Sequence, residues 1–278
     1  MCSSGGSVFI PGLSSSGDTW KGTVVRYQDR FTCHTITLAG FAGVPPTADR
    51  PLLAAVRDQL AQYIEAQHLD KPIVVGHSLG GNVAMDLAAE RPDLVGPLVI
   101  VDSLPFYACV LFRVQTAGAA APMLEAMRKQ FATLTREQYD EFVRAHYATQ
   151  FMVTKPSDLD RLTAWGLQSD PQTVYAAMLE LYGSDSRPAL PRIASPTLVL
   201  GTWAGIRDQM KQAQMTIAKD AVIEEFQQQY RTLSRLHFGL NETARHFVMF
   251  DDPGWYYAQL DAFLVDPPAA TAERGFTR

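Results

Sequence analysis

A serine stands at the centre of residues 76–80, Gly-His-Ser-Leu-Gly, which have the G-x-S-x-G spacing of a nucleophile turn. Residues 73–75 before it are apolar and β-branched, as in a buried strand, and residues 80–90 after it are typical of a helix. A sharp turn between strand and helix exposes the serine hydroxyl, and glycine tolerates the crowding on either side. The helix start also offers free backbone N–H groups to a developing negative charge. The segment therefore predicts Ser78 as a catalytic nucleophile.

The elements that must position this turn alternate between short apolar strands and amphipathic helices. Six strands are expected, at residues 7–10, 33–38, 72–75, 98–101, 197–200 and 236–240. Helices are expected from Pro51 onward, over residues 80–90 and over residues 254–265, and an extra one over residues 219–234 would cover the sheet. Strands that alternate with helices form parallel sheets covered on both faces. We therefore expect an α/β fold with a mostly parallel sheet of about six strands.

No strand is predicted over residues 103–192, which leaves a long helical insertion between two strands of the sheet. Three helix starts are predicted there. Thr135 with Gln138 has the capping-box spacing, and Ser157 with Asp160 is a looser match to it. Residues 169–171 give a third start, with proline after aspartate. We expect residues 103–192 to form a helical cap, or lid. Residues 1–102 and 193–278 would then form the core.

Together these features resemble the α/β-hydrolase superfamily, and the resemblance runs from Ser7 to about Val265. Its landmarks are the strand and loop at 8–13, the turn at 76–81, the strand that ends in Asp102, the helical insertion, and the segment 245–247. The chain order of serine, acid and histidine also matches that superfamily. The resemblance implies a serine esterase with a cap, the α/β-hydrolase fold and an active site between core and cap.

The resemblance also implies a base and an oxyanion hole. His246 lies in a loop after the last predicted strand, just before Phe247 and an acidic turn, as the base of the superfamily does. The backbone N–H groups of Leu79, next to the nucleophile, and of Leu13, after the first strand, would bind the oxyanion. The serines at 14–16 beside Leu13 are expected to form a flexible surface loop without a role. His77 should point away from Ser78, and structural or solvated roles are expected for the remaining histidines: His34, His68, His146 and His237.

The acid of the triad has two candidates. Most members of the superfamily carry it three residues past the glycine that ends the strand at 197–201, and that position is Ala204 here. Other members carry it at the end of the preceding strand, where this chain has Asp102. Asp102 closes a strand at the same sheet edge as the nucleophile, so we take it as the carboxylate that fixes the tautomer of His246. Asp208, in the loop expected after Ala204, is the alternative acid.

The composition limits the partners and cofactors. A net charge of −5 and a pI near 5.7 argue against nucleic-acid and anionic-membrane partners, because both need a basic face. Cys2, Cys33 and Cys109 lack the spacing of a disulfide framework or a zinc site, so neither a metal nor another cofactor is expected. The chain has no apolar stretch of ~20 residues and no signal-peptide pattern at its start. We expect a cytoplasmic protein, or a periplasmic or secreted one whose leader has been removed.

The residues predict a serine hydrolase that cleaves carboxylic esters of small to medium apolar substrates through an acyl-enzyme intermediate. Aromatic and methionine side chains in the expected cap indicate an apolar pocket for the acyl or alcohol group. C–C bond hydrolysis, lactone opening and amide cleavage use the same triad and remain open. The alternative from another class is a non-catalytic ligand-binding protein of the same fold, because the usual acid position holds an alanine.

Overall fold

One parallel β-sheet organises the part of the chain that the computed structural model describes, which is residues 5–148, 151–265 and 275–276. Its strands lie in the order β2-β1-β3-β4-β5-β6-β7, and every neighbouring pair is parallel. The strands are β1 (Gly6–Ile10), β2 (Thr32–Thr35), β3 (Ile73–His77), β4 (Leu98–Val101), β5 (Thr197–Thr202), β6 (Leu236–Asn241) and β7 (Gly275–Phe276). The expected α/β fold with about six parallel strands is confirmed, and the two-residue β7 extends one edge.

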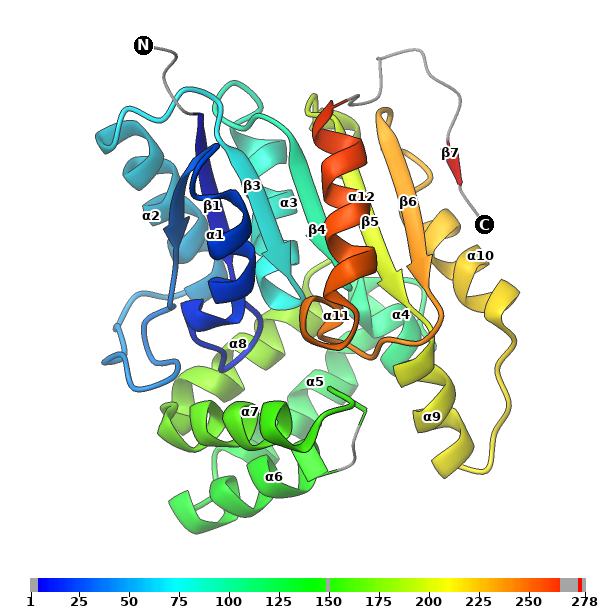
Figure 1. Cartoon of the computed structure of the whole chain (residues 1–278). Helices are drawn as coiled ribbons and strands as arrows, with labels where there is room; N and C mark the ends of the chain where they lie inside the picture. The colour runs from blue at the N-terminus through cyan, green and yellow to red at the C-terminus, as the bar shows by residue number, and fades with distance from the viewer. Residues whose placement is uncertain (1–4, 149–150, 266–274, 277–278) are drawn as a thin grey trace.

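Helices cover both faces of the sheet, which explains why its central strands are mainly apolar. In Figure 1, α1 (Lys21–Tyr27) and α12 (Pro253–Val265) lie in front of the sheet, and α2 (Leu52–Ala66) and α3 (Leu79–Glu90) lie behind it. Every residue of β3, β4 and β5 is buried. Outside the insertion lie also η1 (Gly17–Trp20), α9 (Ala204–Gln212), α10 (Lys219–Gln229) and α11 (Val248–Asp251), and η2 (Leu190–Arg192) stands at the end of the insertion.

Five α-helices of the described residues lie between β4 and β5 in the chain and cover the carboxyl ends of the strands (Figure 1). They are α4 (Tyr107–Leu111), α5 (Ala117–Phe131), α6 (Arg136–Ala148), α7 (Pro156–Gln168) and α8 (Pro171–Gly183). α8 packs against α2, α4 and α5, and α6 packs against α7. We call α4 to α8 the inserted helices. They stand over the edge of the sheet at which β3, β4 and β5 end.

Local capping signals account for two of the three expected helix starts in this region. At the start of α6, the Thr135 N–H donates to Gln138 Oε1 at 2.9 Å, and the Gln138 N–H donates to Thr135 Oγ1 at 3.3 Å. α8 begins with Asp170 as its N-cap, as expected. α7 differs, because its first residue is Pro156 and Ser157 therefore lies inside the first turn. Proline at the first helical position explains this earlier start.

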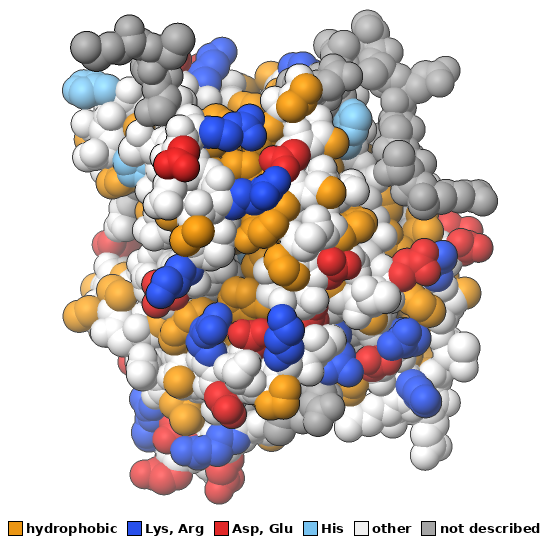
Figure 2. All heavy atoms as spheres, in the orientation of Figure 1, with side chains coloured by type: hydrophobic (Ala, Val, Ile, Leu, Met, Phe, Trp, Pro, Cys, Tyr) orange, Lys and Arg blue, Asp and Glu red, His pale blue; other side chains and the backbone are white. Residues whose placement is uncertain are grey.

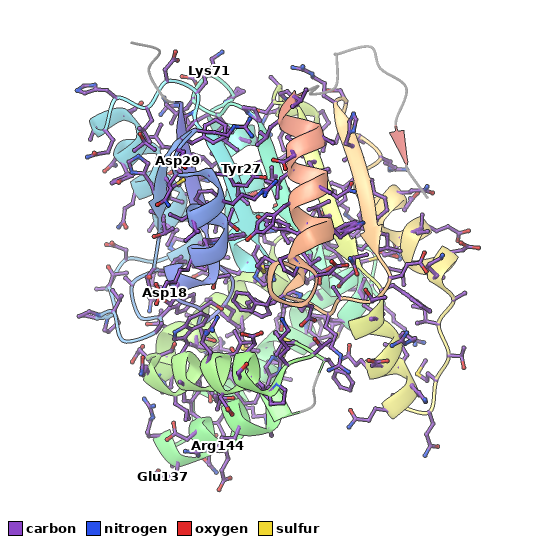
Figure 3. All side chains as sticks on the ribbon, viewed as in Figure 1. Asp18, Tyr27, Asp29, Lys71, Glu137 and Arg144 are labelled. Atoms are coloured by element: carbon purple, nitrogen blue, oxygen red, sulfur yellow. The ribbon has the colours of Figure 1, made fainter. Side chains whose placement is uncertain are left out.

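Charges of both signs are interspersed on the surface of the face formed by α1 and α12 (Figure 2). Tyr27 of α1 donates a hydrogen bond to Asp261 of α12 at 2.9 Å, and Arg30 pairs with the same carboxylate at 3.7 Å. Glu137 and Arg144 lie on the side of α6 away from the sheet (Figure 3). In the described ranges, no helix is long and apolar enough to span a membrane.

Candidate active site

Ser78 lies in a turn between β3 and α3, with a φ of 53° and a ψ of −121°. This conformation is costly for a residue with a side chain and is typical of a nucleophile turn. Two glycines allow it. A Cβ on Gly76 would lie 2.2 Å from Gly80 O, and a Cβ on Gly80 would lie 2.4 Å from Ile10 O. The local sequence therefore dictates the turn, and the side chain of Ser78 remains partly exposed at the edge covered by the inserted helices.

The loop after β1 packs directly against this turn. A Cβ on Gly12 would lie 3.2 Å from Ser78 Cβ and 3.0 Å from His77 Nδ1. Leu13 follows Gly12, and Leu79 is the first residue of α3, where a backbone N–H has no acceptor inside its own helix. The structure thus brings the two segments that carry the predicted oxyanion donors to the nucleophile.

The serines beside Leu13 correct the sequence prediction of a flexible surface loop. Ser14 is 5% exposed and Ser15 is 1% exposed. The Oγ of Ser14 lies 2.9 Å from the hydroxyl oxygen of Tyr147 in α6, and the side chain of Ser16 caps η1. The prediction was wrong because the inserted helices cover this loop. Long-range packing of that kind leaves no signal in the loop's own residues.

His246 and Asp102 meet at the carboxyl edge of the sheet, with 2.6 Å between His246 Nδ1 and Asp102 Oδ2. Asp102 has a φ of 45° immediately after β4. Its Oδ1 accepts the backbone N–H of Thr202 at 2.9 Å, and its Oδ2 accepts the Thr202 hydroxyl at 2.9 Å. Because an ionised carboxylate only accepts hydrogen bonds, Nδ1 of His246 is the donor, and in the neutral imidazole Nε2 is then the acceptor. Thr202, at the end of the strand next to β4, was not singled out from the sequence.

His77 supports the loop that carries His246. Its ring is fully buried, and its Nε2 donates to the backbone oxygen of His246 at 3.0 Å. Burial first, and then the charge of His246, hold the pKa of His77 well below its usual value, so this ring is neutral. Its centroid lies 4.3 Å from that of Phe247. As expected, the ring points into the structure, where it positions the backbone of His246.

Asp208, the alternative acid, lies in helix α9 rather than in the expected loop. Its carboxylate pairs with Arg207 at 2.7 Å and with Arg245 at 3.1 Å. Burial raises its pKa, but hydrogen bonds from Arg207 and Arg245 outweigh this and hold the pKa below its ordinary value. Arg245 also donates to the backbone oxygen of Val153 at 2.9 Å. Asp208 thus fixes the residue that precedes His246, while His246 itself contacts Asp102.

Two cavities flank this site. The larger has a volume of about 630 Å³ and is lined by Asp102, His146, Phe151, Met152, Thr202, Gly205, Ile206, Gln209, Gln212, Ala213 and His246. The smaller has a volume of about 80 Å³ and is lined by Gly12, Leu13, Ser14, His77, Tyr139, Phe142, Val143, His146, Tyr147, Met152, Val174, Met178, Tyr182 and Phe247. His146 and Met152 line both, so they stand between the two cavities.

His146, for which the sequence suggested a structural or solvated role, is exposed and lines both cavities. Its ring stacks on Phe142, with centroids 5.7 Å apart and planes at 23°. Sequence reasoning missed this position because the packing of α6 over the sheet brings His146 to the cavities.

Two further observations concern metals and thiols. Cys33 and Cys109 are free thiols, and Cys2 lies outside the described residues. Among the residues that the structure describes, no group of three or more His, Cys, Asp or Glu side chains could hold a metal ion.

Comparisons with known proteins agree with this architecture. Residues 8–259 match a family model described as the alpha/beta hydrolase family. The chain is 28% identical over 218 residues to the pimeloyl-(acyl-carrier protein) methyl ester esterase of Nitrosomonas europaea. This match covers 74% of this chain and 81% of that protein. The fold is similar to that of a thermophilic esterase from Thermogutta terrifontis, with a TM-score of 0.74, 20% identity and coverage of 95% and 91%. It is also similar to that of an enol-lactonase from Burkholderia xenovorans LB400, with a TM-score of 0.70, 15% identity and coverage of 95% and 92%.

Proposed function

The chain belongs to the alpha/beta hydrolase family, and on this basis we propose that it is a serine hydrolase that cleaves carboxylic esters through an acyl-enzyme intermediate. The observation that carries the proposal is the 2.6 Å contact between His246 and Asp102 at the sheet edge where Ser78 lies. Ser78 is the nucleophile, His246 the base and Asp102 the acid. The curated relative from Nitrosomonas europaea is named as an ester hydrolase, which supports the choice of an ester bond.

The same three side chains act in both halves of the reaction, acylation of the serine and hydrolysis of the acyl-enzyme. As Ser78 Oγ attacks the ester carbonyl, its proton passes to His246 Nε2, and Asp102 stabilises the imidazolium that forms. The backbone N–H groups of Leu13 and Leu79 donate to the carbonyl oxygen as it becomes an oxyanion, and each such donor typically contributes about 10²–10³-fold in rate. His246 then gives its proton to the departing alcohol, leaving the acyl group on Ser78. Water repeats these steps and releases the acid.

The inserted helices act as a cap over this site in the proposal. Tyr147 of α6 touches the loop of Leu13 through Ser14, and His146 and Met152 stand between the two cavities. A cap of this kind limits the size of the substrate, which supports small to medium esters rather than emulsified long-chain triglycerides. C–C bond, lactone and amide hydrolysis would use the same residues. The non-catalytic alternative rested on Ala204, and the contact of Asp102 with His246 removes that reason.

A fluorophosphonate probe should label the native protein once, on the peptide that contains Ser78, because only an activated serine attacks phosphorus rapidly. Hydrolysis of p-nitrophenyl acetate should fall in proportion to the labelled fraction, as measured by mass spectrometry and absorbance on the same samples. Heat-unfolded protein is the control and should not react. Labelling at another residue, or full labelling with unchanged turnover, would contradict the proposal.

A further inference from the structure

The acidic turn at residues 251–253 follows His246 in the chain, and its first carboxylate joins two distant segments. Oδ2 of Asp251 accepts the backbone N–H of Arg245, the residue before His246, at 2.9 Å. Oδ1 accepts the backbone N–H of Thr154 at 2.8 Å and the Thr154 hydroxyl at 2.7 Å. Thr154 belongs to the insertion and lies between α6 and α7. One side chain therefore links the loop of the proposed base to the inserted helices.

Residues 152–154 of the insertion lie alongside the loop that carries the proposed base, and two more hydrogen bonds join them to it. The backbone N–H of Phe247, which follows that base, donates to Met152 O at 3.1 Å. The guanidinium of Arg245 donates to Val153 O at 2.9 Å. We call residues 152–154 the linking segment. Each of its three residues is thus bonded to the base loop or to the acidic turn.

The backbone around His246 is held at three successive groups. Asp251 accepts the N–H that precedes this residue, and the fully buried His77 donates to the carbonyl oxygen of His246 at 3.0 Å. Met152 O accepts the N–H that follows. The bond from Nδ1 to Asp102 fixes one atom of the ring. Two of the three backbone contacts therefore depend on the linking segment, since Met152 belongs to it and Asp251 is bonded to it.

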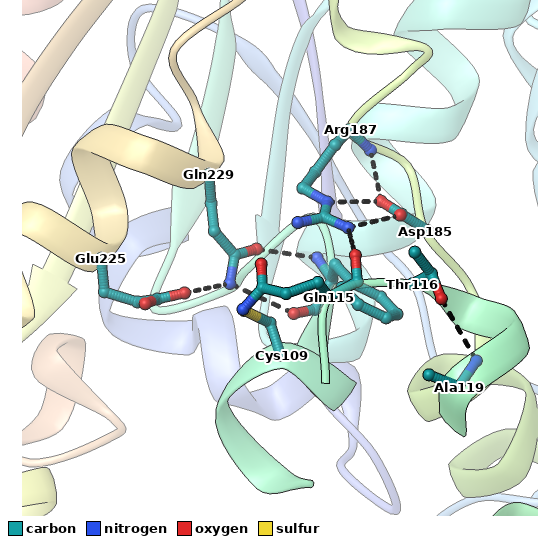
Figure 4. Close-up of polar contacts among 9 residues, drawn as sticks. Cys109, Gln115, Thr116, Ala119, Asp185, Arg187, Glu225 and Gln229 are labelled. Carbon is teal, nitrogen blue, oxygen red and sulfur yellow. Dashed lines mark hydrogen bonds and ion pairs between the residues drawn. The ribbon is translucent and has the colours of Figure 1, made fainter. Parts of the chain in front are cut away.

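The insertion also has attachments to the core that do not involve this turn. Near its start, Gln229 of α10 accepts the Phe106 N–H at 3.0 Å and donates to Phe106 O at 3.2 Å (Figure 4). Near its end, Arg187 pairs with Asp185 at 2.7 Å (Figure 4) and lies over the ring of Phe106, 4.5 Å from its centroid. Loss of the Asp251 contacts would therefore release the linking segment while both ends of the insertion stay attached.

We propose that Asp251 is a positioning residue for His246, and that the linking segment of the insertion completes the support of this base. The proposal rests on the serine esterase function proposed above and explains how that site keeps its base in place. The imidazole must face Ser78 while it binds Asp102. A misplacement of about 1 Å in a catalytic group can cost about 10²-fold in rate. The inserted helices are in this way part of the catalytic apparatus as well as its cover.

Two changes at Asp251 separate its two contacts. Asp251→Ala removes both. Asp251→Asn keeps one acceptor, which should face the half-buried Arg245 N–H, because the exposed Thr154 can donate to water instead. The asparagine NH₂ then faces Thr154, so this variant cuts only the link to the insertion.

We expect the rate constant for labelling of Ser78 by a fluorophosphonate to fall about 10-fold in Asp251→Asn and about 100-fold in Asp251→Ala. The kcat/KM for p-nitrophenyl acetate should fall by the same factors, because both reactions need the base to take the serine proton. The final labelled fraction should stay complete, as measured by mass spectrometry. A role in stability alone would instead lower the labelled fraction and leave the rate constant unchanged.

Asp261→Asn is the matched control, because it makes the same chemical change in a carboxylate that joins α12 to Tyr27 and Arg30. It should leave the labelling rate and kcat/KM within twofold, even where thermal melting shows a loss of stability. Hydrogen exchange then locates the effect of Asp251→Asn. Peptides from residues 152–155 and 245–250 should exchange faster than in the wild type, and peptides from β3 should not.

Three results would overturn the proposal. Wild-type labelling rates in both Asp251 variants would show that the carboxylate does not position His246. A wild-type rate in Asp251→Asn with a slow Asp251→Ala would confine its action to the base loop and exclude the insertion. An unchanged rate constant with a lower labelled fraction would reduce Asp251 to a stabilising residue.

Two further readings keep the test decisive. If thermal melting shows that Asp251→Ala is unfolded, the labelling rate of Asp251→Asn decides by itself. The wild-type protein separates this proposal from the function on which it rests. Labelling of wild-type Ser78 leaves the serine esterase function intact whatever the Asp251 variants do, and its absence would refute that function instead.

Discussion

Replacing Ser78 with alanine should lower kcat/KM for p-nitrophenyl acetate by about 10⁵-fold or more, which is the scale of nucleophile loss in triad hydrolases. The Ser78 hydroxyl forms the covalent bond in the proposed mechanism, and no neighbouring group replaces it. The turn itself does not depend on that hydroxyl, because Gly76 and Gly80 make the room for it. Circular dichroism and thermal melting should therefore show a folded protein with near wild-type stability.

A serine elsewhere in the chain is the control for this change. Ser195 is 4% exposed, donates to the backbone oxygen of Val95 at 2.9 Å, and lies before the amino end of β5, opposite the active-site edge. Ser195→Ala should leave kcat/KM within twofold and lower the free energy of unfolding by about 1 kcal/mol. If Ser78→Ala retained activity within a few-fold of wild type, the serine-hydrolase proposal would fail.

The nucleophile was predictable from the sequence because its constraint is local. Gly76, Ser78 and Gly80 lie within one turn, and the backbone atoms that a Cβ would strike, at 2.2 Å and 2.4 Å, lie in the same turn and in the adjacent β1. The sheet was predictable for a similar reason, since β3, β4 and β5 are buried along their whole length and so are mainly apolar. Periodicity and glycine sterics determine both features within a few residues.

The features that sequence reasoning missed depend on packing between distant segments. Ser14 is buried because Tyr147, more than a hundred positions later, covers it. His146 lines the cavity beside His246 only because α6 lies over the sheet. Local sequence patterns do not predict contacts between distant segments. The helix α9 was also missed, because a loop was expected after Ala204.

The acid of the triad was only partly predictable from the sequence. The sequence placed a carboxylate, Asp102, at the end of β4. The pairing of Val101 with Leu200 then places Asp102 beside the end of β5. The partner that fixes the carboxylate, Thr202, was visible only in the structure. The choice between Asp102 and Asp208 was therefore open in the sequence, and the contacts of the two carboxylates make it testable.

Asp102→Asn should keep the fold but lower kcat by about 10³–10⁴-fold, because the amide selects the wrong tautomer of the imidazole. The buried N–H of Thr202 donates to Oδ1 of Asp102 at 2.9 Å. An asparagine must keep its oxygen there, since two donors cannot face each other, and its NH₂ then faces the Thr202 hydroxyl and His246 Nδ1. Nδ1 is forced to accept, the proton moves to Nε2, and His246 can no longer take the proton of Ser78.

Asp208→Asn is the matched control, because it makes the same chemical change at the alternative acid. Its amide oxygen can still accept from Arg245, and ion pairs at partly exposed positions typically contribute ~1 kcal/mol or less. We therefore expect kcat within about threefold of wild type and a small loss of stability. Steady-state kinetics and thermal melting of the two variants, purified in parallel, decide between the carboxylates. A severe loss for Asp208→Asn with a mild one for Asp102→Asn would move the acid to α9, and mild effects in both would leave Ser78 and His246 as a dyad. Only the large loss confined to Asp102→Asn agrees with the geometry, in which one carboxylate binds Thr202 through both oxygens and His246 through one of them.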